Sequence, residues 1–181
     1  MSVTIVCALI AVVLQLIVAP AITIAGVVPN FIMVAAVILA MHHAPVRSML
    51  TGFFLGFIYD LCSLGPMGAM TLVLTILSFI VSSINKDAIG GGVLVEIFVL
   101  FAVVTLGELL TSVIYSVAGV NPEFLLSLIY RVLPAIVINT VIGCILTLIY
   151  NAVLMSKSTN TPLGMGAGRK KGRSISRKIY K

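Results

Sequence analysis

The stretch of sequence that decides the fold is GFFLGFIYD, at residues 52–60. Gly52, Gly56 and Asp60 follow one another at intervals of four, so in a helix they share one face. Two glycines four residues apart allow a second helix to approach closely, and an aspartate within a membrane should face protein or water. We therefore expect a helix whose Gly52/Gly56 face packs against a helix or a partner protein. The alternative is that the glycines only pack an internal seam and that Asp60, near the outer end, is hydrated.

The composition around this stretch is that of a membrane protein. Of the 181 residues, 61% are hydrophobic and 9% are charged, whereas soluble domains carry about 25% charged residues. The mean hydropathy is +1.26. Since a bilayer span takes about 20 apolar residues, a chain of this length holds six spans, short loops and one tail. This leaves no room for a folded soluble domain, which excludes most enzyme classes and any module that reads nucleic-acid sequence.

We expect an all-α, polytopic integral membrane protein with six transmembrane helices. Proline, glycine and asparagine mark the breaks between the apolar runs. The expected helices cover residues 3–20, 24–41, 47–63, 67–84, 91–117 and 124–153. Together they form a transmembrane domain at 1–155, which a basic tail at 156–181 follows. If the first two helices merged, five spans would remain and the N-terminus would lie outside the cell.

The charges predict how the chain lies in the membrane. Residues 1–150 contain three bases and five acids, whereas the last 31 residues contain eight bases and no acid. With six spans, the loops that carry Arg47 and Lys86 fall on the same side as the tail, so both termini should be cytoplasmic. The tail is expected to be disordered and attracted to anionic lipid. Its basic cluster is Arg169, Lys170, Lys171 and Arg173.

The polar residues expected inside the spans are Asp60, Glu108, Arg131 and Asn139. Because ionisable groups within membranes usually pair, we expect a buried polar cluster in the outer half of the protein. Arg131 should contact Asp60 or Glu108 within about 4 Å, the usual limit for an ion pair. The two acids near span ends, Glu96 and Glu123, are expected to be solvated.

No pattern in the sequence indicates catalysis, a cofactor or a metal. The three cysteines lie far apart and lack a zinc spacing. His42 and His43 are neighbours without an acid or a cysteine nearby, which favours an interfacial loop over a metal site. A proton or ion relay through the charged residues of the cluster is the alternative, but no second carboxylate stands three or four residues from any of them. We therefore expect no enzyme.

Three pieces of the sequence resemble the MreD family of bacterial rod shape-determining membrane proteins. Residues 52–68 read G-F-x-x-G-F-x-x-D-x-x-S-x-G-P-x-G, which is similar to the family signature and includes Gly65 and Pro66. Pro29-Asn30 resembles the start of its second helix, and Arg131-x-x-Pro134 followed by Asn139 resembles its last helix. The resemblance covers residues 3–153. His42-His43 depart from the basic residues expected there, and the basic tail is not part of the pattern.

The resemblance implies a non-enzymatic subunit of the cell-elongation machinery in the bacterial inner membrane. MreD-like proteins act with MreC, and through it with MreB filaments, RodA and a class B penicillin-binding protein, to place sidewall peptidoglycan synthesis. The resemblance also implies a fold distantly similar to the substrate-binding subunits of energy-coupling-factor vitamin transporters. Neither a cofactor nor a small-molecule substrate is expected for such a scaffold.

The alternative function is a small-molecule-binding subunit of an energy-coupling-factor-type vitamin transporter. Ala36, Ala40 and Ala44 form a stripe of small residues that could dock a coupling subunit. Against this alternative, the outer loops are short and offer few polar groups, whereas a ligand site usually gathers convergent polar groups around a cavity.

Overall fold

The structure, a computed structural model, describes residues 2–23, 26–63, 65–84, 92–120 and 123–159. All the regular elements within these ranges are helices, as the sequence predicts. They are α1 (Ser2–Val13), continued by the turns η1 (Leu14–Val18) and η2 (Ala19–Ala21), then α2 (Phe31–His42), α3 (Pro45–Cys62), α4 (Ala69–Ser83), α6 (Val93–Val117), α7 (Phe124–Ser127), η3 (Leu128–Val132) and α8 (Leu133–Thr159).

Most helix ends lie within two residues of the predicted positions, but two differ by more. The helix α2 begins at Phe31 rather than at 24, because Asn30 caps its first turn: the Asn30 side chain accepts a hydrogen bond of 2.9 Å from the Met33 amide. The helix α8 continues to Thr159 rather than ending at 153. Residues 154–161 contain neither proline nor glycine, so no strong helix breaker stands between the predicted end and Pro162.

Within the described ranges, three helical segments are long and apolar enough to cross a membrane. They are Thr4–Ala21, Val93–Val117 and Phe124–Val153, with mean hydropathies of 2.4 to 2.5. The helices α2 and α4 are also apolar but have only 12 and 15 residues. At 1.5 Å per residue these two extend about 18 and 22 Å, less than the roughly 30 Å of a bilayer core. The protein therefore combines long helices with short ones.

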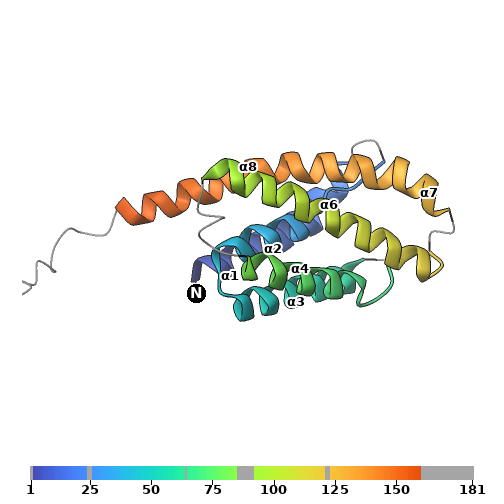
Figure 1. Ribbon diagram of the computed structural model, residues 1–181, viewed down its shortest axis with the longest axis horizontal. Coiled ribbons are helices and arrows are strands. Elements are labelled where there is room, and N and C mark those ends of the chain that lie inside the picture. The colour runs from blue at the N-terminus through green and yellow to red at the C-terminus, as the bar shows by residue number, and fades with distance from the viewer. Residues whose placement is uncertain (1, 24–25, 64, 85–91, 121–122, 160–181) are drawn as a thin grey trace, which may run out of the picture.

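The short helix α2 lies at the centre of the bundle. Figure 1 shows it between the α6 and α8 pair on one side and the α3 and α4 pair on the other, and it contacts α1, α3, α4, α6 and α8. Ten of its twelve residues are buried. Its sequence is apolar on every face, as expected of a helix that is enclosed on all sides.

The helices α3 and α4 pack with their backbones in contact. A Cβ atom on Gly52 would lie 2.5 Å from the Leu74 carbonyl oxygen, and one on Gly56 would lie 2.6 Å from Thr71 Cα. Only glycine at both positions permits this approach. The Gly52/Gly56 face is therefore covered by α4 of the same chain, so it is not open to a partner protein.

The two π turns among the described residues each come just before a proline. The turn Leu14–Val18 precedes Pro20, and the turn Leu128–Val132 precedes Pro134. Proline lacks the amide hydrogen that would continue the helix, and its ring crowds the carbonyl four residues earlier. A widened turn relieves this crowding without breaking the helix. The predicted single helix at 124–153 is therefore a short helix, a π turn and a long helix.

The close packing of α3 on α4 at Gly52 and Gly56 predicts that larger residues at these positions destabilise the protein. Gly52→Leu and Gly56→Leu should each lower the free energy of unfolding by more than about 3 kcal/mol, the upper end for overpacking, because the added atoms meet backbone that cannot move aside. Both variants should still insert, since leucine favours insertion. The recovery of folded protein by size-exclusion chromatography measures the effect.

The matched control is Cys62→Leu, a small-to-large change at an exposed position of the same helix. It should be recovered as well as the unaltered protein. Normal recovery of both glycine variants would show that α3 and α4 do not pack through this face.

Candidate functional site

The carboxylate of Asp60 caps the start of α4. Its Oδ2 atom accepts hydrogen bonds from the Gly68 amide at 3.1 Å, the Thr71 amide at 2.8 Å and the Thr71 hydroxyl at 2.6 Å. Its Oδ1 atom accepts a bond of 3.1 Å from the Met70 amide. These amides belong to Gly68, the residue before α4, and to the first turn of α4, where helix amides lack partners within the helix. A negative charge is favoured at that end of a helix.

Burial of Asp60 shows that it is a structural cap rather than a hydrated side chain. Its side chain is 4% exposed, so the alternative of a hydrated Asp60 is wrong. The loop that it closes contains Gly65 and Pro66, and the Pro66 carbonyl accepts a bond of 3.2 Å from the Ala69 amide. The signature residues thus serve one local purpose, which is to join the end of α3 to the start of α4.

Arg131 lies against an aromatic ring at the same end of the bundle. Its guanidinium carbon is 5.3 Å from the centre of the Tyr115 ring, a distance at which a cation is attracted to a ring face. The Tyr115 hydroxyl in turn packs against the backbone of Gly65 in the α3–α4 loop, where the Cβ atom of any other residue would collide with it. This arrangement connects α6, η3 and the loop.

The charged residues of the predicted cluster lie in one region of the protein. Tyr59 interacts electrostatically with Asp60, Glu108 and Arg131. Within this region, however, the hydrogen bonds divide the residues between two tasks: Asp60 caps α4, and Glu108 belongs to a separate network with Asn139.

Asn139 joins three helices near the start of α2. It is 1% exposed. Its Oδ1 atom accepts a bond of 2.8 Å from the Asn30 amide before α2, and its Nδ2 group donates a bond of 2.8 Å to Glu108 Oε1 on α6. Both sides of the amide are therefore used, which fixes α8 against α2 and α6 at one depth.

Gln15 adds a fourth segment to this network and was not among the predicted residues. Its Nε2 group donates to the Pro29 carbonyl at 3.2 Å, and its Oε1 atom accepts a bond of 3.4 Å from the Ile32 amide. The sequence could have indicated a role for Gln15, because it is a single polar residue in an otherwise apolar run at residues 5–22. A lone polar side chain in such a run indicates a bond to another helix.

A second amide–carboxylate bond joins α6 and α8 near their other ends. Asn151 Nδ2 donates a bond of 2.6 Å to Oε2 of the half-buried Glu96, a contact between helices that was not predicted from the sequence. Asn139 and Asn151 are twelve residues apart, as are Glu96 and Glu108. The two bonds therefore fix the register of this antiparallel pair at two levels. The equal spacing of the two asparagines and the two acids in the sequence could have predicted this pairing.

The chemistry of these sites is hydrogen bonding between helices. Within the described ranges, no group of three or more His, Cys, Asp and Glu residues could hold a metal ion. The basic cluster of the tail lies outside the described residues, as does Lys86. The polar residues of these sites bond one helix to another.

A groove of about 410 Å³ lies between α1, α2 and α8. Its lining is apolar except for the Cys7 thiol and the Tyr150 hydroxyl. It therefore lacks the convergent polar groups that hold a vitamin or a similar small molecule.

Comparison with known proteins identifies one family. A family model described as rod shape-determining protein MreD matches residues 1–157, which include all the helices apart from the last two residues of α8. No curated protein and no solved structure matches the chain.

The Asp60 cap predicts a graded effect of substitution. Asp60→Ala should lower the free energy of unfolding by about 3 kcal/mol or more, because it leaves several buried amides without an acceptor. Asp60→Asn should cost less, since it keeps one oxygen for these donors. Unfolding in mixed micelles measures both variants. Equal losses, or no loss with alanine, would contradict the capping role.

Proposed function

Because this chain belongs to the MreD family of rod shape-determining proteins, we propose that it is a non-enzymatic membrane scaffold subunit of the cell-elongation complex. In this proposal it binds an MreC-like membrane protein, and through that protein it acts with MreB, RodA and a class B penicillin-binding protein. Its role is to support sidewall peptidoglycan synthesis. The family match over residues 1–157 is the observation that carries the proposal.

The construction of the bundle supports a scaffold role. Its interior polar groups bond one helix to another, as Asn139 does with α2 and α6, and the described groove is apolar. A scaffold has to hold one shape while other proteins dock on it. Since α4 occupies the Gly52/Gly56 face, the partner is proposed to dock on an outward face of the bundle instead.

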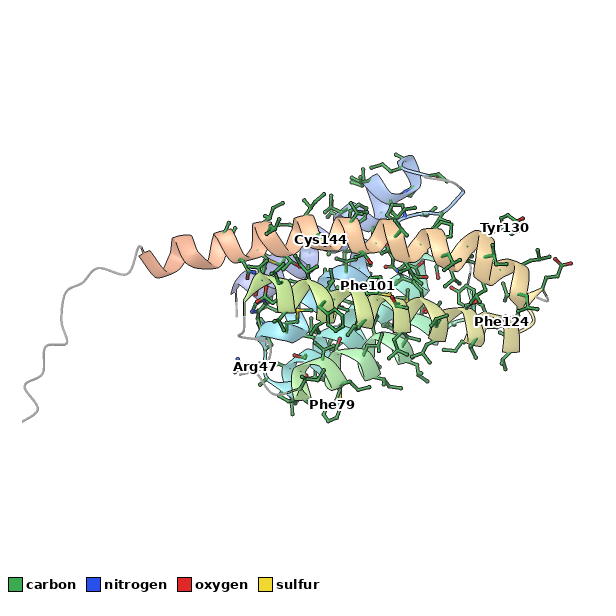
Figure 2. All side chains as sticks on the ribbon, turned by 45° about the horizontal axis from the view of Figure 1, so that its top comes forward. Arg47, Phe79, Phe101, Phe124, Tyr130 and Cys144 are labelled. Atoms are coloured by element: carbon green, nitrogen blue, oxygen red, sulfur yellow. The ribbon has the colours of Figure 1, made fainter. Side chains whose placement is uncertain are left out.

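We place the protein in the bacterial inner membrane with six crossings and both termini in the cytoplasm. Arg47 lies at one end of the bundle, whereas Phe124 and Tyr130 lie at the other (Figure 2). The last turns of α8 project beyond the other helices at the Arg47 end (Figures 1 and 2). The basic tail follows these turns in the sequence, which supports the cytoplasmic assignment of this end.

Nothing in the described part of the chain favours the vitamin-transporter alternative. The groove between α1, α2 and α8 lacks polar groups for such a ligand. In the stripe of small residues, Ala36 and Ala40 are 1% and 0% exposed within the core. Ala44 is exposed but lies beyond the end of α2, so the stripe forms no continuous surface.

Co-purification tests the proposed function. The tagged full-length chain, extracted in mild detergent from the membranes of its own cells, should bring down an MreC-like protein in near-stoichiometric amount. Gly56→Leu, which disrupts the α3–α4 seam, should lose that protein, whereas Cys62→Leu should keep it. Recovery of a transporter ATPase in place of the MreC-like protein would refute the proposal.

A further inference from the structure

The helices α3 and α4 form one side of the bundle, and this side is short. At one end, α3 begins after the extended residue Ala44 and carries the exposed Arg47 in its first turn. At the other end, residues 65–68 between the two helices are not helical. The helix α4 returns to the first end and stops at Ile84, where the backbone is extended. Since irregular backbone is not exposed to lipid within the hydrocarbon core, these ends mark the limits of the core along this side.

Exposed apolar side chains on the α3–α4 side cover less than the thickness of a bilayer core. On α3 they extend from Val46 to Leu61, which is about 22 Å at 1.5 Å per residue. On α4 they extend from Leu72 to Ile84, which is about 18 Å. A bilayer core is about 30 Å thick. The α3–α4 side is therefore short of an ordinary bilayer by roughly 8 Å or more.

The opposite side of the bundle, formed by α6 and α8, reaches the full thickness. Its exposed apolar side chains extend from Leu94 to Val117 on α6, which is about 34 Å, and from Leu133 to Val153 on α8, which is about 30 Å. Figure 1 shows α6 and α8 extending past α3 and α4 at both ends. One bundle thus presents two different apolar thicknesses to the membrane.

The contacts of α3 and α4 keep this side from adjusting to the membrane. Backbone contact at Gly52 and Gly56 holds the two helices together. The Asp60 carboxylate fixes the start of α4 to the end of α3, and the Tyr115 hydroxyl of α6 packs against the loop at Gly65. Tilting would only shorten the reach of both helices across the membrane. A short hydrophobic stretch that is held in place in this way is accommodated by thinning of the surrounding bilayer.

We propose that the protein thins the bilayer along its α3–α4 side and leaves it at full thickness along its α6–α8 side. This inference rests on the proposed six crossings and goes beyond the scaffold role, because it assigns the protein an effect on the lipid itself. Lipids with short acyl chains should collect along α3 and α4. Membrane proteins with short spans should also be favoured there, since mismatch sorts proteins by the thickness of the membrane around them.

Tryptophan fluorescence at two positions of the full chain measures the local lipid preference. The chain contains no tryptophan, so Phe54→Trp on α3 and Phe101→Trp on α6 each introduce one reporter at an exposed position. Each variant is reconstituted in liposomes that contain dioleoylphosphatidylcholine with brominated chains, which quenches tryptophan on contact. This quencher is diluted either with unbrominated dioleoylphosphatidylcholine or with dimyristoleoylphosphatidylcholine, which has shorter chains.

The two reporters should prefer different lipids in the same liposomes. At Phe54→Trp, the short-chain lipid should displace the quencher about threefold more effectively than unbrominated dioleoylphosphatidylcholine does, because each ångström of mismatch carries a small cost that the lipids of this side share. At Phe101→Trp, it should displace the quencher no better than dioleoylphosphatidylcholine. Phe79→Trp on α4 is a second reporter of the short side. It should agree with Phe54→Trp, and it decides the question if Phe54→Trp fails to fold.

Two results would overturn the proposal. The same lipid preference on both sides of the bundle would show that the bilayer has one thickness around the whole protein. Absence of quenching at both Phe54→Trp and Phe79→Trp would show that lipid does not reach the α3–α4 side, as when a second copy of the chain covers it. Neither result depends on an MreC-like protein, so failure of this proposal is distinguishable from failure of the proposed function.

Discussion

The start of α2 has to find acceptors for its backbone amides in the middle of an apolar bundle, and the rest of the structure depends on how this is done. Helices lack a strong hydrophobic drive to associate in lipid, so packing and polar bonds must hold them. Side chains from three segments supply the acceptors: Asn30 takes the Met33 amide, Asn139 takes the Asn30 amide and Gln15 takes the Ile32 amide. The helix can then be enclosed on all sides, and the others pack around it.

At α4, the other short helix of the bundle, a side chain from a neighbouring helix also accepts the first backbone amides. Asp60 reaches across from α3 to accept the amides of its first turn, and the two glycines of α3 allow the backbones to touch. At the start of both short helices, side chains of other helical segments therefore accept backbone amides, and at α2 the Asn30 side chain accepts one as well. The long α6 and α8 are tied to each other by Asn139–Glu108 and Asn151–Glu96. A bundle built in this way keeps one arrangement, which suits a scaffold in the MreD family.

The sequence predicts the elements of this fold better than their contacts. Hydropathy and proline or glycine breaks place the helices, and the spacing of Gly52 and Gly56 predicts a packed face, because both signals are local. The partners of Asp60, Gln15 and Glu96 depend on which helices are neighbours, which no local pattern determines. The start of α2 at Phe31 could have been predicted from the sequence, because asparagine is a strong helix cap and Asn30 precedes it. The burial of α2 could not, because it depends on the positions of five other helices.

The most direct test of this account compares two identical substitutions in α8. Asn139→Leu removes the acceptor of the Asn30 amide and the donor to Glu108, whereas Asn151→Leu removes only the bond to Glu96 near the end of the bundle. Unfolding of the purified protein in mixed micelles should show a loss of about 2–3 kcal/mol for Asn139→Leu and less than about 1 kcal/mol for Asn151→Leu. Equal losses, or a larger loss for Asn151→Leu, would contradict the claim that the start of α2 holds the bundle together.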